Sequence, residues 1–544
     1  MSQPNYATTS DSKSIMIPKY LVISLLTLFS FGPQYFLNLS YILNQTVIQN
    51  GLNLSAHDML LPSVMSNLAF ALGVPLGRVL SMKYGIRRNY LTFIFIFFCG
   101  SIINSFSSEL ISLIIGRTIQ GFSAGVLFLT ILPVSLKSYP NKVRNLFLFF
   151  AIGGLFGSSA VGAFFGSLSL STNTWRWLFI FNLFSSLLCL LIGYAVLPKH
   201  QPKQHDNHPV DRRGVFLLCL IVMVLAFPLS NLQEKGFGSV YVWPLLLIAM
   251  ILSAMFINVD LHAENPLVPL RSLWAAKPVS GTIMAISSHV ALVVAIAGIN
   301  GFLRNIINPP FMYLSYFYIW FFAGIMAAAI LSTLLYDRLG AGILGVIGSL
   351  AVIVVGIQWK NIGAEASLNA LYVQIACLGG GVSMVLISGA LGTALAGDIH
   401  KATMRSASLH SMRNFIGAVS APLLGWFVYR ANAVHYENIR GQVSLINPEI
   451  NRELAELTHR FMDSGLTAAD AKNMAIYSVV VNARKASILG AYHDLFTILL
   501  VLGVIMMVAS IGKAVTGKGR SLVQKEARVL LPAPSEKPKM DTTA

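Results

Sequence analysis

One arginine stands inside a long apolar stretch of this chain. Arg117 is the only charged residue between Glu109 and Lys137, and this stretch is long enough to cross a bilayer. A permanent cation within a membrane helix costs at least about 2.5–3.5 kcal/mol on insertion scales, so such residues usually have a function. The guanidinium could simply join helices through backbone carbonyls. In a protein that moves solutes, it more often faces a cavity and tunes a nearby titratable group.

Groups that could carry a proton lie in three other places. His57 and Asp58 precede the apolar segment 59–81, and Asp58 could equally be a helix-start acid that favours the helix dipole. His289 lies near the centre of the segment 279–300, and its intrinsic pKa suits a switch, although a buried imidazole bonded to serine is the structural alternative. His493 and Asp494 begin the last apolar segment and are expected at the membrane interface.

The first apolar segment contains amides where an acid would be needed to carry a proton. No Asp or Glu lies between Asp11 and Asp58, and the segment offers Gln34, Asn38 and Asn44 together with Ser40. Amides can hydrogen-bond a polar substrate but do not titrate near neutral pH. Arg304, at the outer end of the ninth segment, could face an anionic substrate or lipid headgroups.

The composition predicts that these residues lie on membrane-spanning helices. Of the 544 residues, 55% are hydrophobic and 11% are charged, and the mean hydropathy is +0.69. Soluble domains are about a quarter charged, so an all-α polytopic membrane protein is expected. Fourteen segments are long enough to span about 30 Å of hydrocarbon. They lie near 20–43, 59–81, 90–107, 110–136, 145–168, 175–197, 214–232, 239–258, 279–300, 311–335, 341–358, 367–396, 408–429 and 489–512.

The positive charge predicts the orientation. With both termini in the cytoplasm, most of the 38 Lys and Arg residues lie on the inner side, as the positive-inside rule requires. The net charge of +17 therefore indicates topology and contact with anionic lipid, and it does not indicate a nucleic-acid partner. The expected location is a plasma membrane, most simply a bacterial inner membrane.

The spacing of the segments predicts a division into six, two and six helices. The expected parts are an N-terminal tail (1–19), a six-helix bundle (20–198), a cytoplasmic linker (199–213), two extra helices (214–258), a cytoplasmic loop (259–278), a second six-helix bundle (279–512) with a long outer loop (430–488), and a basic tail (513–544).

Several motifs resemble those of one transporter family. Arg117, Gln120 and Gly121 match the Arg-x-x-Gln-Gly signature in the fourth span of the major facilitator superfamily, and the chain resembles its fourteen-span drug:proton antiporters. Further matches are Trp175-Arg176-Trp177 with Asn182, Asp211, Asn265-Pro266, and Met412-Arg413-Asn414 with Gly417. The resemblance implies two six-helix bundles around a central cavity, two extra helices, and proton-driven alternating access.

Two cytoplasmic turns echo each other, as in the halves of a transporter. Gly85 and Gly340 each stand two residues after a basic residue. The resemblance implies a gating role for these two turns. The family expects an acid in both, but the first turn has Met82, or Ser81 in a shifted alignment, whereas the second keeps Asp337. The candidate gating residues are Lys83, Gly85, Arg87, Arg88, Asp337, Arg338 and Gly340.

The fifth span also departs from the family pattern. Gly157-Ser158 stands where the family has a Gly-Pro pair. Small residues recur every four positions, at Gly154, Ser158, Gly162 and Gly166, which places them on one helix face. Such a stripe lets two helix backbones approach closely.

The outer loop 430–488 contains two helix-start signals. Asn447-Pro448-Glu449 combines an N-cap residue with a proline at the first helical position. Thr467 and Asp470 form a second start, and the helix that they open is expected to continue into the last span. The loop could be a lid, a partner site or a solvated connector.

The predicted function is export of an organic compound from the cytoplasm in exchange for protons. The family often has an acid in its first span, and the amides there favour a neutral, amphipathic or anionic substrate over a cation. The alternatives are uptake or facilitated diffusion, and a receptor or assembly factor on the same fold. No nucleophile–base pair, metal-type spacing or phosphate loop is evident, so no enzyme, cofactor or metal is expected. The expected partners are a small molecule, protons and lipid, and a periplasmic adaptor if the host has two membranes.

Overall fold

The described structure is made of helices. The computed structural model describes residues 17–198, 211–396, 401–442, 448–517 and 522. Within these ranges, twelve helices are long and apolar enough to cross a membrane. One of them, α11 (Phe311–Lys360), contains two segments that meet at Gly340, where φ is 81°, and α13 (Ala402–Gln442) completes the second bundle. Fourteen helical segments therefore build the bundle, which confirms the predicted all-α fold.

The first bundle comprises seven helical pieces that form six spans. They are α1 (Lys19–Leu52), α2 (Leu60–Tyr84), α3 (Ile86–Ser105), α4 (Leu110–Ser138), α5 (Leu146–Ile152) joined through the π-helical turn η2 (Gly153–Gly157) to α6 (Ser158–Thr172), and α7 (Arg176–Val196). The accessory pair is α8 (Arg212–Lys235) and α9 (Trp243–His262). The second bundle contains α10 (Ala276–Phe302) with η4 (Leu303–Ile307), α11, α12 (Leu368–Ala394), α13 and α15 (Ala468–Val515).

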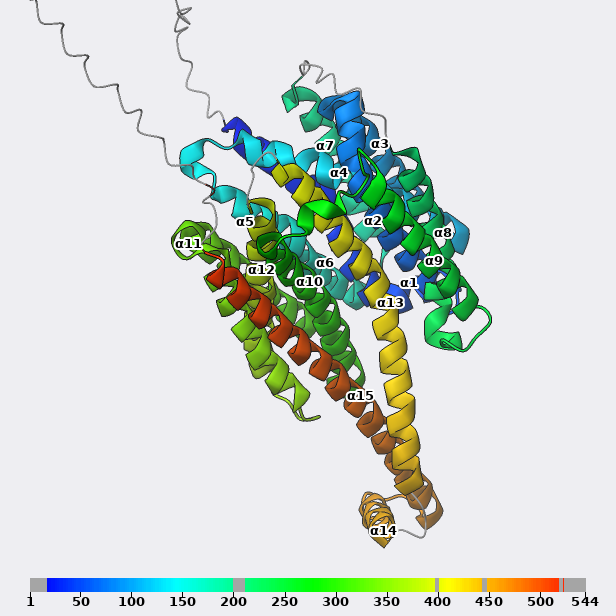
Figure 1. The fold of residues 1–544 in the computed structure, drawn as a ribbon. Coiled ribbons are helices and arrows are strands. Elements are labelled where there is room, and N and C mark those ends of the chain that lie inside the picture. Colours follow the sequence, from blue (N-terminus) through cyan, green and yellow to red (C-terminus); the bar gives the residue numbers. More distant parts are fainter. Residues whose placement is uncertain (1–16, 199–210, 397–400, 443–447, 518–521, 523–544) are drawn as a thin grey trace, which may run out of the picture.

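Apolar runs of this length become helices because a bilayer offers no water to satisfy exposed backbone groups. Short connections then force neighbouring spans to run in opposite directions. The start of α1 and the end of α15 consequently lie at one end of the bundle, opposite α14 (Figure 1). We call these ends the terminal face and the α14 face.

Small residues set the closest helix contacts. A side chain at Gly121 on α4 would collide with the carbonyl oxygen of Ser66 on α2, and one at Gly162 on α6 would collide with that of Phe36 on α1. The predicted stripe does lie against α1, since Gly154 contacts the ring of Phe31. Close backbone approach through small residues is how membrane helices associate tightly.

The two bundles meet along two seams. The helix α2 packs against α13, and α5 and α6 pack against α11. The accessory helix α8 lies against both α2 and α13, and α9 packs on α8 at the periphery (Figure 1). The accessory pair therefore covers the α2–α13 seam.

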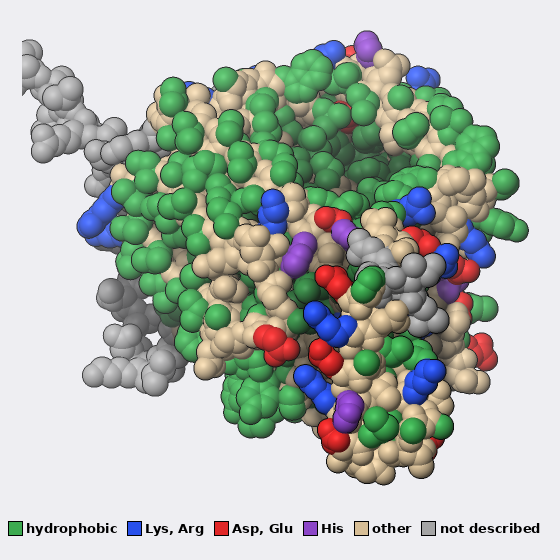
Figure 2. All heavy atoms as spheres, turned by 90° about the horizontal axis from the view of Figure 1, so that it is seen from below, with side chains coloured by type: hydrophobic (Ala, Val, Ile, Leu, Met, Phe, Trp, Pro, Cys, Tyr) green, Lys and Arg blue, Asp and Glu red, His purple; other side chains and the backbone are tan. Residues whose placement is uncertain are grey.

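The predicted outer loop is largely helical. The helix α13 continues to Gln442, α14 (Pro448–Asp463) follows, and α15 begins at Ala468, capped by the Thr467 hydroxyl, which accepts a hydrogen bond from the Asp470 N–H (3.3 Å). The predicted start at Pro448 and the continuation into the last span are confirmed, whereas Asn447 lies outside the described residues. The α14 face carries a concentration of Lys, Arg, Asp, Glu and His side chains (Figure 2).

Candidate functional site

Arg117 is fully buried in the first bundle. Its Nη2 donates to Asn38 Oδ1 on α1 (3.1 Å), and its guanidinium lies over the Tyr41 ring (5.1 Å). Nε and Nη1 are buried and have no hydrogen-bond partner. The structural alternative, in which backbone carbonyls bind this guanidinium, is not what the described contacts show. The arginine is held by neutral side chains of α1 and keeps donors to spare.

The other two residues of the motif position α4. Gln120 accepts from Asn104 on α3 (2.6 Å) and donates to Ser101 (2.8 Å), so it ties α3 to α4. Gly121 lets α4 pack against the α2 backbone at Ser66. The motif therefore combines the charged residue Arg117 with two residues, Gln120 and Gly121, that hold α4 against its neighbouring helices.

The predicted amides of α1 divide into two groups. Gln34 donates to Ser66 (3.0 Å) and to Asn38 (3.2 Å), and Asn38 donates to Asn67 (2.7 Å). These residues extend the polar network that begins at Arg117. Asn44 instead donates to the carbonyl of Gly166 on α6 (2.9 Å), so it ties α1 to α6.

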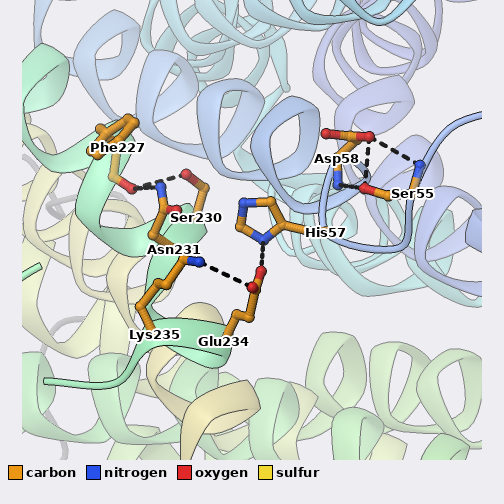
Figure 3. A network of polar contacts seen from close by, with 8 residues as sticks. All are labelled: Ser55, His57, Asp58, Phe227, Ser230, Asn231, Glu234 and Lys235. Carbon is orange, nitrogen blue, oxygen red and sulfur yellow. Dashed lines mark hydrogen bonds and ion pairs between the residues drawn. The ribbon is translucent and has the colours of Figure 1, made fainter. Parts of the chain in front are cut away.

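His57 and Asp58 are half-buried and lie in the turn before α2 (Figure 3). The Asp58 carboxylate accepts from the Ser55 hydroxyl (2.7 Å) and the Ser55 N–H (2.9 Å), and these bonds lower the pKa of Asp58. His57 Nδ1 lies 3.1 Å from Glu234 at the end of α8. Among the described contacts, no hydrogen bond or ion pair joins Asp58 to Arg117. Asp58 is instead bonded to Ser55 within its own turn.

The remaining outer candidates are placed on the second bundle. Arg304 in η4 donates to the backbone carbonyl of Leu43 (3.5 Å) and to the side-chain hydroxyl of Thr46 (3.4 Å). Both residues are on α1, so Arg304 bridges the two bundles near the α14 face. His493 contacts the carbonyl of Ile362 (2.7 Å), and Asp494 pairs with His435 of α13 (2.8 Å). Both residues at the start of the last span therefore have partners.

A second buried arginine lies between the bundles. Arg413 on α13 is 1% exposed, and its Nη2 donates to the hydroxyl of Tyr35 on α1 (3.0 Å) and to Asn414 Oδ1 (3.1 Å). Its guanidinium is 5.8 Å from the ring of Phe128 on α4. The sequence showed Arg413 only as part of a family motif. No local pattern in the sequence marks it as a site, because Tyr35 and Phe128, which it contacts, belong to the other bundle.

Two histidines accompany this arginine. His410 is 6% exposed, and its ring lies 5.0 Å from the Phe128 ring. His289 on α10 lies against Gly417 of α13, where an added Cβ would collide with the imidazole. The Nδ1 atoms of both histidines are buried without a hydrogen-bond partner. His289 thus lies where α10 packs against α13.

The turn between α2 and α3 has a neutral cluster where the family has an acid. Ser81 donates to Thr130 on α4 (3.0 Å), and Asn89 on α3 donates to both Ser81 (3.0 Å) and Thr130 (2.8 Å). These bonds join the ends of α2, α3 and α4 without a charge. Arg87 donates to the carbonyl of Tyr194 on α7 (2.7 Å). Lys83 and Arg88 lie near the Tyr84 ring, 5.3 and 6.0 Å from its centre.

The second turn joins the two bundles. Asp337 on α11 accepts from Asn145 at the start of α5 (2.8 Å) and from the N–H of Leu522 (3.1 Å). Gly340, with a φ of 81°, permits the reversal that follows, and Gly85 has a φ of 83° at the equivalent turn. Arg338 is exposed. The retained acid therefore joins α11 to the start of α5 in the opposite bundle.

The fifth span contains a local change of helix type. Residues Gly153–Gly157 form a π-helical turn, and π-bulges are frequent at functional sites. Gly157 faces Phe322 and Met326 of α11 at 3.6 and 3.9 Å from an ideal Cβ position. Ser158, which stands where the family has proline, packs against Gly32 of α1.

The comparisons with known proteins agree with this architecture. The model of the Major Facilitator Superfamily matches residues 23–422. The Bacillus subtilis (strain 168) protein described as "Uncharacterized MFS-type transporter YubD" is 28% identical over 520 residues, which cover 95% of this chain and 93% of that protein. The "Quinolone resistance protein NorB" of Staphylococcus aureus (strain MRSA252) is 30% identical over 195 residues, 36% of this chain and 40% of its own length.

Solved structures share the fold at low sequence identity. The human organic anion transporter MFSD10 (TETRAN) has a TM-score of 0.52 at 12% identity and covers 90% of this chain and 100% of its own. The nucleoside transporter NupG (D323A mutant) has a TM-score of 0.51 at 11% identity and covers 90% and 99%. These similarities support the helical arrangement alone.

Proposed function

Because the chain belongs to the major facilitator superfamily, we propose that this transporter exports an organic compound from the cytoplasm in exchange for protons, by alternating access. Its two accessory helices and the motifs around Arg117 support placing it with the fourteen-span drug:proton antiporters. Both termini then lie in the cytoplasm, and the terminal face is the inner face.

The observation that carries the proposal is the state of Arg117. It is 0% exposed, it contacts Asn38 and Tyr41, and two of its three guanidinium nitrogens lack a hydrogen-bond partner. An unneutralised cation in the membrane is costly, so it is expected where a ligand or a change of state completes its contacts. A passive scaffold would have no need of such a group.

Export is favoured over uptake by two features. The Arg-x-x-Gln-Gly motif is complete in this chain, and a relative over part of the sequence is described as a quinolone resistance protein. The partial match supports the direction of transport and does not identify the substrate. Uptake or facilitated diffusion is the second candidate, because the first span has no acid and the fifth span has no Gly-Pro pair.

The experiment uses purified full-length protein in liposomes of defined pH gradient. Candidate compounds, including quinolones, are loaded and their flux is followed with the gradient imposed in either direction. Exchange predicts that substrate moves against the proton flow and that the gradient collapses faster when substrate is present. Flux that is equal with and without a gradient would favour facilitated diffusion, and no flux of any compound would favour a receptor or assembly role.

A further inference from the structure

Arg413 lies in a buried set of hydrogen-bond donors at the interface between the bundles. The set consists of Arg413, Asn414 and His410 on α13 with Tyr35 on α1, and each is at most 8% exposed. Arg413 uses only Nη2 for hydrogen bonds, while Nε and Nη1 are buried without a partner. Nδ2 of Asn414 and Nδ1 of His410 are also unpartnered. We call these four residues the Arg413 cluster.

The helices that contribute the Arg413 cluster and the aromatic rings around it are almost free of carboxylates. The helices α1, α2, α4 and α10 contain no Asp or Glu, and α13 contains only Glu437, which pairs with Arg440 near the α14 face. None of the ion pairs of the described residues includes Arg413. Burying a charge without a partner is strongly unfavourable, so a counter-charge is expected from outside the protein.

The surroundings of the cluster are aromatic. Phe128 lies under the guanidinium of Arg413 and packs edge-on against Phe31 (4.9 Å between centroids) and Phe70 (6.1 Å). Tyr35 packs edge-on against both of these phenylalanines. A ligand that reaches Arg413 therefore meets flat apolar surfaces beside a set of donors. Charge-assisted bonds from a guanidinium to an oxyanion are among the strongest hydrogen bonds in proteins.

The two buried arginines, Arg117 and Arg413, both contact the same face of α1. Tyr35 contacts Arg413, and Asn38, which contacts Arg117, follows three residues later. Residues three apart are neighbours on a helix surface. Both cations therefore border one stretch of α1, and neither has an acidic partner there.

We infer that the substrate of this transporter is an aromatic or amphipathic organic anion whose oxyanion group binds Arg413 and Asn414, with its apolar part against Phe128 and Phe70. The inference rests on the proposed transport function. It adds the charge of the substrate and the residues that recognise that charge. A neutral analogue of the same shape leaves the guanidinium unneutralised and binds more weakly. Lipid headgroups are not the source of the anion, because the cluster is buried between the bundles.

The test uses pairs of probes that differ only in charge. Purified wild-type protein in detergent is titrated with 2-naphthoate and 2-naphthamide, and with biphenyl-4-carboxylate and its amide, and binding is followed by thermal stabilisation. We expect each carboxylate to bind at least about tenfold more tightly than its amide, which corresponds to about 1.4 kcal/mol. Equal binding of acid and amide, or no binding of either carboxylate, would overturn the inference.

Two variants locate the site. Arg413→Gln is expected to abolish the preference for the carboxylate, whereas Arg430→Gln, which removes an exposed arginine from the same helix, should retain it. If Arg413→Gln does not fold, Asn414→Leu should lower the affinity for the carboxylate and not for the amide. Carboxylate selectivity that survives in Arg413→Gln, or in Asn414→Leu if Arg413→Gln does not fold, would refute the assignment. Selective binding with no flux in liposomes would refute transport and leave the anion site standing.

Discussion

At the residue scale, two buried arginines dominate the molecule. Arg117 lies within the first bundle, and Arg413 lies between the bundles with Tyr35 as its partner from the other half. Both have unused donors on Nε and Nη1. Since permanent charges are rare and expensive in a membrane, these two residues are the first to test.

We predict that Arg117→Ala abolishes transport and leaves expression intact. The substitution removes a guanidinium that Asn38 and Tyr41 only partly satisfy, so little stabilisation is lost. Substrate efflux from liposomes, compared at equal amounts of incorporated protein, measures the effect. The control is Arg430→Ala, which removes an exposed arginine and should transport normally. Unchanged efflux with Arg117→Ala would contradict the proposed role.

The pH dependence separates Asp58 from His289. Hydrogen bonds from Ser55 lower the pKa of Asp58, so the carboxylate is already ionised at neutral pH. The stabilisation that its ionised form provides is present above the ordinary pKa and is lost only as the pH falls through the lowered value. Asp58 therefore does not change charge between about pH 5 and 8, the range in which histidine commonly titrates.

We accordingly expect Asp58→Asn to keep the pH profile of exchange. Because we propose His289 as the proton carrier, we expect His289→Gln to flatten that profile. Initial rates of substrate-dependent proton uptake, measured across that range in liposomes, give both profiles. His493→Gln serves as a control on the second bundle, because His493 contacts the Ile362 carbonyl at the start of the last span. Retention of the full profile in His289→Gln would exclude that histidine as the proton carrier.

At the element scale, helix contacts through glycine decide the packing. The predicted stripe on the fifth span lies against α1, and the spacing of four predicted this because it repeats nearly once per helical turn. The π-helical turn at Gly153–Gly157 was not foreseen, since a single change of hydrogen-bond register leaves no mark in the hydropathy pattern.

We predict that Gly162→Ala destabilises the protein and that Gly512→Ala does not. A methyl group at Gly162 collides with the carbonyl oxygen of Phe36, so α6 and α1 must separate, at a cost of about 1–3 kcal/mol for an overpacked contact. Gly512 on α15 has nothing within 4 Å of an added Cβ. Thermal unfolding in detergent measures both, and equal melting temperatures would show that the α1–α6 contact can yield.

The parts of α13 and α15 that lie next to α14 are a second feature at this scale (Figure 1). Together with α14, these helices extend beyond the rest of the bundle, and His435 pairs with Asp494 at 2.8 Å where α13 and α15 come together (Figure 1). The sequence predicted an outer loop with two helix starts. The helices are longer than the apolar segments because helix formation does not stop where hydropathy does, provided that a partner helix or solvent satisfies the polar side chains.

At the scale of the whole molecule, contacts between the bundles define the state of the transporter. Asp337 joins α11 to the start of α5 on the terminal face, and Arg304 joins η4 to α1 near the α14 face. The neutral cluster of Ser81, Asn89 and Thr130 joins helices of the first bundle to one another and, among the described hydrogen bonds, does not reach the second bundle. We therefore propose that closure of the terminal face depends on Asp337, an acid from the second half.

We predict that Asp337→Ala shifts the population toward a state open at the terminal face. The variant loses hydrogen bonds to a charged group, each worth about 1.5–3 kcal/mol, which is enough to change a two-state population about tenfold. Spin labels at the exposed residues Lys142 and Lys401 report the distance between the bundles. The control Asp463→Ala removes an exposed acid from α14. An unchanged distance distribution in Asp337→Ala would rule out this closure.

The sequence by itself determined the class of the fold, the number of spans, the small-residue stripe and the motif around Arg117. These depend on composition and on periodicities of three to four residues, which are local properties of the chain. Only the tertiary structure decided that Asn44 joins α1 to α6 and that Arg413 contacts Tyr35. Tyr35 and Asn414, which also bond, are 379 residues apart in the chain. Contacts across such a separation follow from how helices pack side by side, which no local pattern specifies.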